Sequence, residues 1–296
     1  MSKRGSFAHR MAPAAAAAAG LVLLLAVYGA PAGAGGRAVL GRSAPHVRVA
    51  AARYQRPIVS LGANRSSNWS GYNQGSIQQG GETFTQISGT WTVPKATQHK
   101  AGEAEYSSSW VGIGGGCVDA GCTLTDGTLI QAGIEQDVAK SGVASYSAWW
   151  EIIPEPSTTI TTITVHAADK VQVTISDPTD TDQWTVVVKD LTNGQTFTKK
   201  TPYPSTHATA EWIVETPVVI DRNGNVTVGP LPNLSRTNFN LGRVNGAAPN
   251  LQASEEIQLV DPNTNQALAT PSSPDPTKDG FNDCAYATTC PAPQQG

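Results

Sequence analysis

The sequence predicts an all-β fold, a two-sheet antiparallel β-sandwich in a single domain. About a dozen short segments alternate between apolar and polar residues, and turn-forming residues separate them. Charged residues make up only 15% of the 296-residue chain, and we find no helical period after the N-terminal leader. Because each strand has one apolar face to bury, we expect two sheets packed against each other.

Residues 1–34 have the features of a secretory signal peptide. Three basic residues precede an apolar run at 14–27, and a small-residue cleavage site follows at 32–34. The apolar run is short for a membrane span, which disfavours an anchor. We therefore expect a secreted, extracellular protein that has no membrane attachment once the signal is removed.

The basic residues are concentrated in front of the first predicted strand. No Asp or Glu occurs before Glu82, and the eight Lys or Arg of residues 1–64 leave twelve basic against 23 acidic residues in the remainder. Residues 35–64 can be a propeptide that lies on the acidic body at neutral pH and leaves as carboxylates protonate. They can equally be a disordered basic linker with no regulatory task. The acidic body argues against a nucleic-acid partner.

The predicted strands begin just after Asn68, and together with their turns they make a domain of residues 65–265. They cover residues 69–73, 84–93, 105–113, 129–135, 143–153, 171–176, 184–191, 195–200, 207–215, 225–228, 235–240 and 256–260. Pro94 ends the second strand and Pro154 the fifth, while Asn193-Gly194 is the strongest hairpin signal. Residues 266–296 are expected to form a Pro-rich C-terminal tail.

The four cysteines form two close pairs, Cys117 with Cys122 and Cys284 with Cys290. In an exported chain this spacing predicts two local disulfides, each of which sets the shape of a short loop. A zinc site is disfavoured because the spacing is not that of a zinc knuckle and no histidine pair is near. The first pair lies in a Gly-rich loop, residues 114–127, between two strands.

Four of the strands separate into a core face and a face suited to a site. Ile130, Ala132 and Ile134 point one way, whereas Gln131 and Glu135 point the other. The second face of this sheet is expected to line a groove that carries Gln131, Glu135, Glu151, Glu211, Trp69, Trp110 and Trp149. Trp150 and Trp212 have the opposite phase and are expected in the core.

Several common hydrolase motifs are absent. The chain has no G-x-S-x-G elbow, no H-E-x-x-H and no Asp-Thr-Gly or Asp-Ser-Gly, and its five histidines are dispersed. The remaining candidates are a carboxylate, which can act as general base towards water, and a side-chain amide, which can stabilise an oxyanion. Together they suffice for amide hydrolysis.

The motifs on the groove face resemble those of the glutamic peptidases, also called eqolisins or family G1. The similarity runs in order over about residues 64–265. It is carried by Asn68-Trp69, Trp110-Val-Gly-Ile, Leu129-Ile-Gln131-Ala-Gly, Ala148-Trp-Trp-Glu151 and Ala210-Glu211-Trp-Ile-Val-Glu215. The resemblance implies a concanavalin-like jelly roll and an endopeptidase that works at acid pH.

The resemblance also implies the roles of single residues. Gln131 and Glu211 fall on the catalytic pair, and the substrate-cleft positions fall on Trp69, Trp110, Trp149 and Glu151. We expect protein or peptide substrates, no cofactor or metal, and a monomer. The chain departs from the pattern at Gly114, where the family has an acidic residue, at Glu135, where it has Asp, and in the longer loop with its own Cys pair.

Two other functions fit parts of the pattern. A lectin-like sandwich could bind or hydrolyse glycans with aromatic side chains and two carboxylates, such as Glu151 and Glu211, although it would not require Gln131. A structural surface protein would need neither Gln131 nor Glu211. Each site residue also has a plainer interpretation: Gln131 can be solvated, Trp110 and Trp149 can be core, and Glu151 can hydrogen-bond a neighbouring loop.

Overall fold

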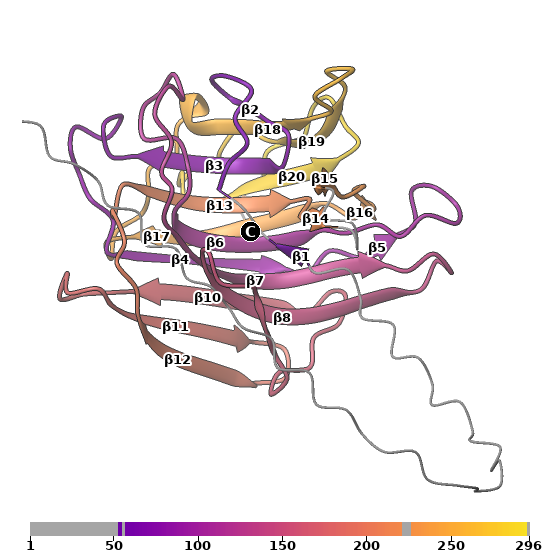
Figure 1. The fold of residues 1–296 in the computed structure, drawn as a ribbon, viewed down its shortest axis with the longest axis horizontal. Coiled ribbons are helices and arrows are strands. Elements are labelled where there is room, and N and C mark those ends of the chain that lie inside the picture. The colour runs from indigo at the N-terminus through magenta and orange to yellow at the C-terminus, as the bar shows by residue number, and fades with distance from the viewer. Residues whose placement is uncertain (1–52, 55–56, 221–225, 295–296) are drawn as a thin grey trace, which may run out of the picture. The chain divides into compact units, whose positions relative to one another are not determined.

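Two antiparallel β-sheets pack against each other in the computed structural model, which describes residues 53–54, 57–220 and 226–294 (Figure 1). The described residues all belong to one compact unit. The predicted signal peptide, residues 1–34, and the first part of the basic segment, up to residue 52, lie outside the described residues. Nowhere in the described ranges is there a helix with the length and apolar character needed to cross a bilayer.

The first sheet carries the site candidates and runs across the front of Figure 1. Its strands, in spatial order, are β3 (Trp69–Gly75), β13 (Thr209–Glu215), β6 (Ser108–Gly114), β7 (Leu129–Val138), β8 (Ala144–Ile152) and β9 (Thr158–Ile160). Although β13 comes late in the chain, it pairs with β3 on one side and β6 on the other. This insertion brings Glu211 next to the strands of Trp69 and Trp110.

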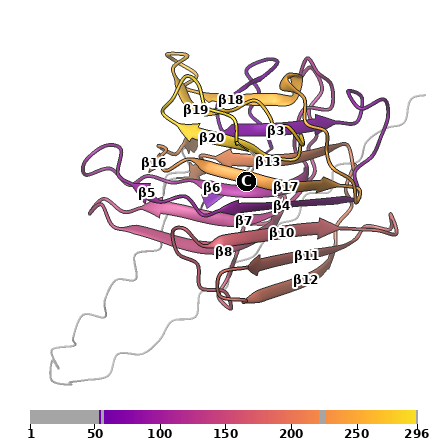
Figure 2. The same ribbon diagram turned by 180° about the vertical axis from the view of Figure 1, so that it is seen from behind.

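The second sheet lies behind the first and faces the viewer in Figure 2. Its order is β12 (Thr196–Pro202), β11 (Gln183–Asp190), β10 (Lys170–Ser176), β4 (Gln86–Thr92), β17 (Thr237–Val244), β20 (Phe281–Ala285) and β19 (Ala267–Pro271). β18 (Glu256–Val260) pairs with both β19 and β3, so the two sheets are continuous through this strand.

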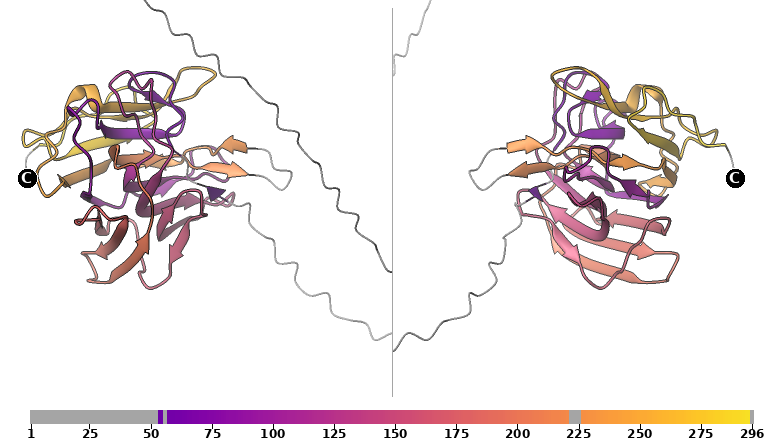
Figure 3. Two further views of the ribbon diagram at one scale, coloured as in Figure 1. Left: turned by 60° about the vertical axis from the view of Figure 1, so that its left-hand side comes forward. Right: turned by 90° about the vertical axis from the view of Figure 1, so that its right-hand side faces the viewer.

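Smaller elements complete the described structure. They are β2 (Arg65–Ser66) beside β18, β5 (Ala96–Thr97) paired with β16 (Asn233–Leu234), and the 3-10 helix η1 (Ala253–Glu255). β1 (Arg53–Tyr54) pairs with β14 (Val218–Ile220), which also pairs with β15 (Val226–Val228). Figure 3 shows β14 and β15 projecting from the sandwich.

The main core lies between the two sheets and follows the strand period. Val171, Val173 and Ile175 of β10 are fully buried, and they alternate with partly exposed polar residues. Ile130 and Ala132 of β7 approach the same core from the first sheet. Trp212 is also in this core, as expected, whereas Trp150 is only half-buried at its edge, with Lys199 Nζ 5.3 Å from the ring centroid.

Several expectations can be compared directly with the fold. The all-β sandwich and both disulfides, Cys117–Cys122 and Cys284–Cys290, are confirmed. The Asn193-Gly194 hairpin joins β11 and β12, with Gly194 at φ 79°. The expected C-terminal tail was wrong, because residues 267–271 and 281–285 form β19 and β20 inside the second sheet. These short strands are half apolar, and their order comes from pairing within the second sheet, of β19 with β18 and β20 and of β20 with β17, which the local pattern did not indicate.

Candidate active site

Gln131 and Glu211 lie in one row that crosses the first sheet. Glu211 is paired with Gly112, Gly112 with Gln131, and Gln131 with Glu151. Residues paired in this way point to the same face, and neighbouring strands are about 4.8 Å apart. The backbones of Gln131 and Glu211 are therefore about 10 Å apart, with the carboxyl and amide side chains on the same side of the sheet.

The next row of the same face holds two of the tryptophans. Trp110 pairs with Gly133, which pairs with Trp149, so a residue without a side chain separates the two indoles. A Cβ at Gly133 would lie only 2.5 Å from the Cβ of Trp110, which shows how closely the side chains pack here. Trp69 contacts Trp110 edge to face, with ring centroids 4.9 Å apart. The three site tryptophans thus form one aromatic group beside the row of Gln131.

The Gln131 amide is oriented by Glu151. Its Nε2 donates a hydrogen bond of 2.7 Å to Glu151 Oε2, and both side chains are buried. A bond to a carboxylate is stronger than one between neutral groups, so it defines which way the amide points. Because the amide nitrogen carries two hydrogens, one N–H remains for another acceptor.

Glu211 occupies a buried and crowded environment. It is fully buried, and neither carboxylate oxygen forms a hydrogen bond of normal geometry with the described residues. Burial raises the pKa of Glu211 well above its ordinary value; the nearby Thr209 hydroxyl acts in the opposite direction, and the negative charge of Asp126 adds to the rise. In this state the carboxyl group therefore favours its protonated form.

A loop closes over Glu211. A Cβ at Gly116 would lie 2.6 Å from Glu211 Oε1 and 1.7 Å from Asn73 Oδ1, so only glycine fits between them. Asn73 fastens the loop to β3, because its Oδ1 accepts from the Cys117 N–H at 2.9 Å and its Nδ2 donates to the Cys117 carbonyl at 2.8 Å. The Cys117–Cys122 disulfide then restricts the shape of the same loop.

A second cover comes from residues 57–60, at the end of the basic segment. Ile58 packs in one apolar cluster with Trp69, Trp110 and Trp149, and only 8% of its surface is exposed. Its N–H donates to the Gly115 carbonyl at 2.8 Å, which links this cover to the loop over Glu211. The two covers together enclose the site face.

The expectation of an open groove was therefore wrong for the chain as folded here. Gln131, Glu211 and the tryptophans Trp69, Trp110 and Trp149 do lie on one face, on the side away from the main core, but all are fully buried. The alternation of side chains along a strand predicts only which face of the sheet each side chain points to. Whether other segments cover that face depends on tertiary contacts.

Two carboxylates near the site have supporting contacts. Glu215 is fully buried and accepts a 2.8 Å hydrogen bond from the Trp110 indole, which holds that ring in place. Glu135 is partly exposed and accepts a 2.9 Å bond from Ser147 Oγ.

Sequence reasoning did not identify Asn73 or Asp126 as parts of the site. No motif in the sequence marks these two residues, because a single Asn or Asp in a strand or loop can equally cap a turn or lie at the surface.

Comparison with known proteins gives a consistent result. A sequence model of the Peptidase A4 family matches residues 67–280. Aspergillopepsin-2 from Aspergillus niger is 28% identical in an alignment of 171 residues that covers 51% of this chain and 56% of the relative. Scytalidopepsin B from Scytalidium lignicola is 28% identical in an alignment of 164 residues that covers 54% of this chain and 55% of the relative. The chain thus matches about half the length of each of these relatives.

Solved structures show the same fold. Scytalido-glutamic peptidase with a transition-state analogue inhibitor superimposes with a TM-score of 0.58 and 22% identity, covering 74% of this chain and 98% of that one. An eqolisin in complex with the tripeptide Ala-Ile-His gives a TM-score of 0.51 at 20% identity, with the same coverage. The expected resemblance to the glutamic peptidases is confirmed by these matches.

Proposed function

Because the chain belongs to the Peptidase A4 family, we propose that it is a secreted endopeptidase that hydrolyses peptide bonds at acid pH with Gln131 and Glu211. The observation that carries this proposal is the row of paired residues, which gives an amide and a carboxyl group to the same face of one sheet. The substrates are proteins or peptides, as the bound tripeptide of the related eqolisin suggests.

In the proposed reaction, ionised Glu211 takes a proton from a water molecule while the water oxygen bonds to the scissile carbonyl carbon. The free N–H of Gln131 donates a hydrogen bond to the oxyanion that forms. Protonated Glu211 then gives its proton to the leaving amine as the C–N bond breaks. One carboxyl group thus acts first as base and then as acid, and it ends the cycle ionised.

The pKa of Glu211 supports an acid working range. In the covered site burial favours the protonated carboxyl, which is not a base. When the covers move aside and water enters, this desolvation decreases, and the pKa falls towards the ordinary glutamate value of about 4.3. In mild acid Glu211 is then ionised and can act as a base. At the same pH the leaving amine is readily protonated.

Trp69, Trp110 and Trp149 are proposed to contact the substrate once they are uncovered. Large indole faces bind extended peptides through apolar contact. In the covered site, Ile58 packs against these indoles where the substrate is proposed to bind. We interpret residues 57–60 as the end of a propeptide that shields the site, in preference to a free linker. Glu151 is then a residue that orients Gln131, because its carboxylate already accepts the amide N–H.

A digestion experiment tests the function. The full chain is incubated at pH about 4, near the glutamate pKa, with denatured casein and separately with a glycan panel. We expect cleavage of casein alone, and no cleavage by the Glu211→Gln variant. Cleavage of glycans would support the lectin-like alternative, and cleavage of neither substrate after the N-terminal cover has been removed would contradict the proposal.

A further inference from the structure

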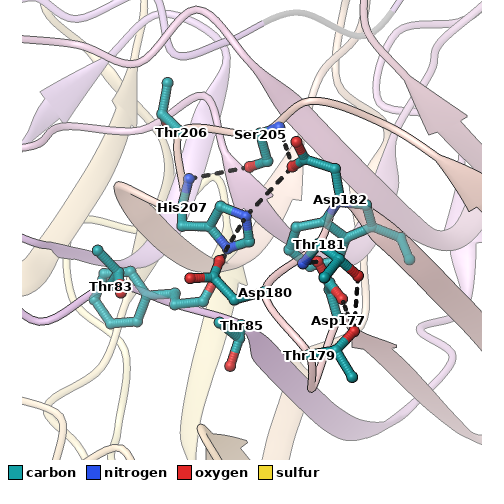
Figure 4. A network of polar contacts seen from close by, with 12 residues as sticks. Thr83, Thr85, Asp177, Thr179, Asp180, Thr181, Asp182, Ser205, Thr206 and His207 are labelled. Atoms are coloured by element: carbon teal, nitrogen blue, oxygen red, sulfur yellow. Dashed lines mark hydrogen bonds and ion pairs between the residues drawn. The ribbon is translucent and has the colours of Figure 1, made fainter.

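A second group of polar side chains lies away from the candidate active site, where three chain segments meet (Figure 4). Asp177 follows β10 directly, Asp182 precedes β11, and His207 lies two residues before β13. One ligand atom from each of these residues lies within 4.8 Å of the others. Two aspartates of the turn between β10 and β11 and one histidine from a distant segment thus converge on one point.

The His207 imidazole is held firmly and in one orientation. Its Nδ1 lies 3.0 Å from the Phe84 carbonyl oxygen, and its ring stacks on Trp184 with centroids 4.9 Å apart. Because a carbonyl oxygen only accepts, Nδ1 must carry the proton. In neutral imidazole the lone pair is then on Nε2.

That lone pair is directed at two carboxylates. Nε2 lies 3.5 Å from Asp180 Oδ1 and 3.6 Å from Asp182 Oδ1, longer than an N–H···O hydrogen bond of about 2.7–3.2 Å. The His207 side chain is only 9% exposed, so water solvates it poorly. A buried acceptor facing two anionic oxygens is unfavourable, so this position calls for positive charge: either a proton on Nε2, which pairs the imidazolium with both aspartates, or a cation between the three groups.

The two distances from Nε2 to the carboxylate oxygens of Asp180 and Asp182 are close to those between ligands of one metal ion. With metal–nitrogen and metal–oxygen bonds of about 2.0–2.2 Å, two ligand atoms of a tetrahedral ion are about 3.4 Å apart. A histidine that binds a metal through one nitrogen usually donates its other N–H to a carbonyl or carboxylate, as Nδ1 does here towards Phe84. The burial and orientation of His207 therefore point to a ligand independently of the acidic residues.

The carboxylates of the cluster are oriented and accessible in a way that suits metal ligands. Asp177 is fully buried and accepts from the Thr181 N–H at 2.8 Å and from the Thr179 hydroxyl at 3.2 Å, which sets its orientation. Its oxygens have further lone pairs for an ion. The side chains of Asp180 and Asp182 are 73% and 46% exposed, which leaves an entry path from solvent.

We propose that Asp177, Asp182 and His207, with Asp180 beside them, bind a divalent transition-metal ion such as Zn²⁺. An imidazole nitrogen favours such an ion over Ca²⁺ or Mg²⁺, which prefer oxygen ligands alone. The bound ion ties the turn between β10 and β11 to the segment that leads into β13, the strand of Glu211. The proposal does not depend on the proposed peptidase activity.

The experiment is a titration of the full chain with Zn²⁺ at pH 7 after treatment with EDTA, followed by calorimetry and by the melting temperature. We expect one strong Zn²⁺ site per chain and a higher melting temperature with the ion. His207→Asn keeps a side-chain N–H for Phe84 and suits the backbone φ of 55°, but lacks Nε2. It should weaken Zn²⁺ binding at least about tenfold and abolish the thermal shift.

His166→Asn is the matched control, because His166 lies 3.4 Å from a carboxylate oxygen of Asp169 but is 72% exposed. It should bind Zn²⁺ as the unchanged chain does. If His207→Asn melts lower than the unchanged chain without metal, Asp182→Asn decides, because its amide oxygen can still accept from the Ser205 N–H. The proposal is overturned if Zn²⁺ does not bind to the unchanged chain. It is also overturned if the variant that decides, His207→Asn or in its place Asp182→Asn, binds Zn²⁺ as tightly as the unchanged chain. Binding of Ca²⁺ as tight as that of Zn²⁺, in both the unchanged chain and His207→Asn, would overturn it as well.

Discussion

The Gln131 amide donates its 2.7 Å hydrogen bond to Glu151 across the β7–β8 pair, and neither side chain reaches solvent. The proposed oxyanion donor is therefore oriented by a carboxylate on the neighbouring strand, before any substrate is present. Its partner in the proposed reaction, Glu211, lies on the other side of Gly112 and forms no such bond with the described residues. One member of the pair is oriented by a neighbouring carboxylate, and the other has no hydrogen-bond partner of normal geometry among the described residues.

The first prediction concerns Glu211. Glu211→Gln keeps the size of the side chain but cannot take a proton from water, so peptide hydrolysis should be lost throughout the acid range. The measurement is kcat/KM for a fluorogenic peptide between pH about 3 and 6, around the glutamate pKa. Glu135→Gln, which changes a partly exposed carboxylate on the same face, is the control and should stay close to the unchanged enzyme. Turnover by Glu211→Gln at the normal rate would rule out the assignment.

The second prediction separates the roles of Gln131 and Glu151. Gln131→Ala removes the oxyanion donor and should lower kcat by about 10² to 10³. Glu151→Gln can still accept the amide N–H, but through a weaker neutral bond, so we expect a smaller decrease of about tenfold in kcat with little change in KM. If Glu151 instead only contacted substrate, its replacement would raise KM and leave kcat unchanged. Steady-state kinetics with one peptide at several concentrations distinguishes the two.

The third prediction concerns the N-terminal cover. Ile58→Ser removes an apolar side chain from the tryptophan cluster, and burying such a side chain contributes about 1.5–3 kcal/mol. The uncovered population of the intact chain should then rise by about ten- to a hundredfold. We expect a correspondingly higher initial rate, measured on freshly purified chain whose intact N-terminus is verified by mass spectrometry. Val59→Ser, at a neighbouring residue that is 40% exposed, is the control. Equal initial rates for all three chains would contradict a shielding role for Ile58.

The fourth prediction is that stability increases in acid. Burial raises the pKa of Asp283 to about 7, against the effect of a hydrogen bond from Ser70, and burial also raises the pKa of Glu211, Glu255 and Glu256. The folded state therefore holds these protons more tightly than the unfolded state, in which an aspartate has a pKa of about 3.9. The free energy of unfolding is highest below that pKa, and it decreases as the pH rises towards 7.

Asp283→Asn isolates one of these groups. The variant should match its parent near pH 4 and be more stable at pH 7, by at most about 4 kcal/mol for a pKa change of three units. Urea unfolding at pH 4, 5.5 and 7 measures this, with Glu211→Gln as common background to prevent self-digestion. Glu82→Gln, at an exposed position, serves as the control. A parent chain that becomes more stable between pH 4 and 7 would refute the prediction.

Local pattern was sufficient for much of the site. Residues 131 and 151 were assigned to the outward face because strand alternation is a property of the chain itself, and the structure pairs them directly. The disulfides were predictable for a similar reason, since cysteines only five and six residues apart are near each other in almost any loop. The cluster of His207 with Asp177 and Asp182 had no such signal, because the histidine comes from a segment distant in sequence from the turn that holds both aspartates.

Local residue order was enough to predict the strands, the phase of each strand and the family motifs, since these depend on neighbouring residues. Contacts between distant segments place β13 between β3 and β6, complete the second sheet with β19 and β20, and bring Ile58 over the face of the tryptophans. The physical reason is that strand neighbours and covers are selected by the burial of apolar surface between segments far apart in the chain. An alternating pattern within one segment carries no information about which distant segment will bury it.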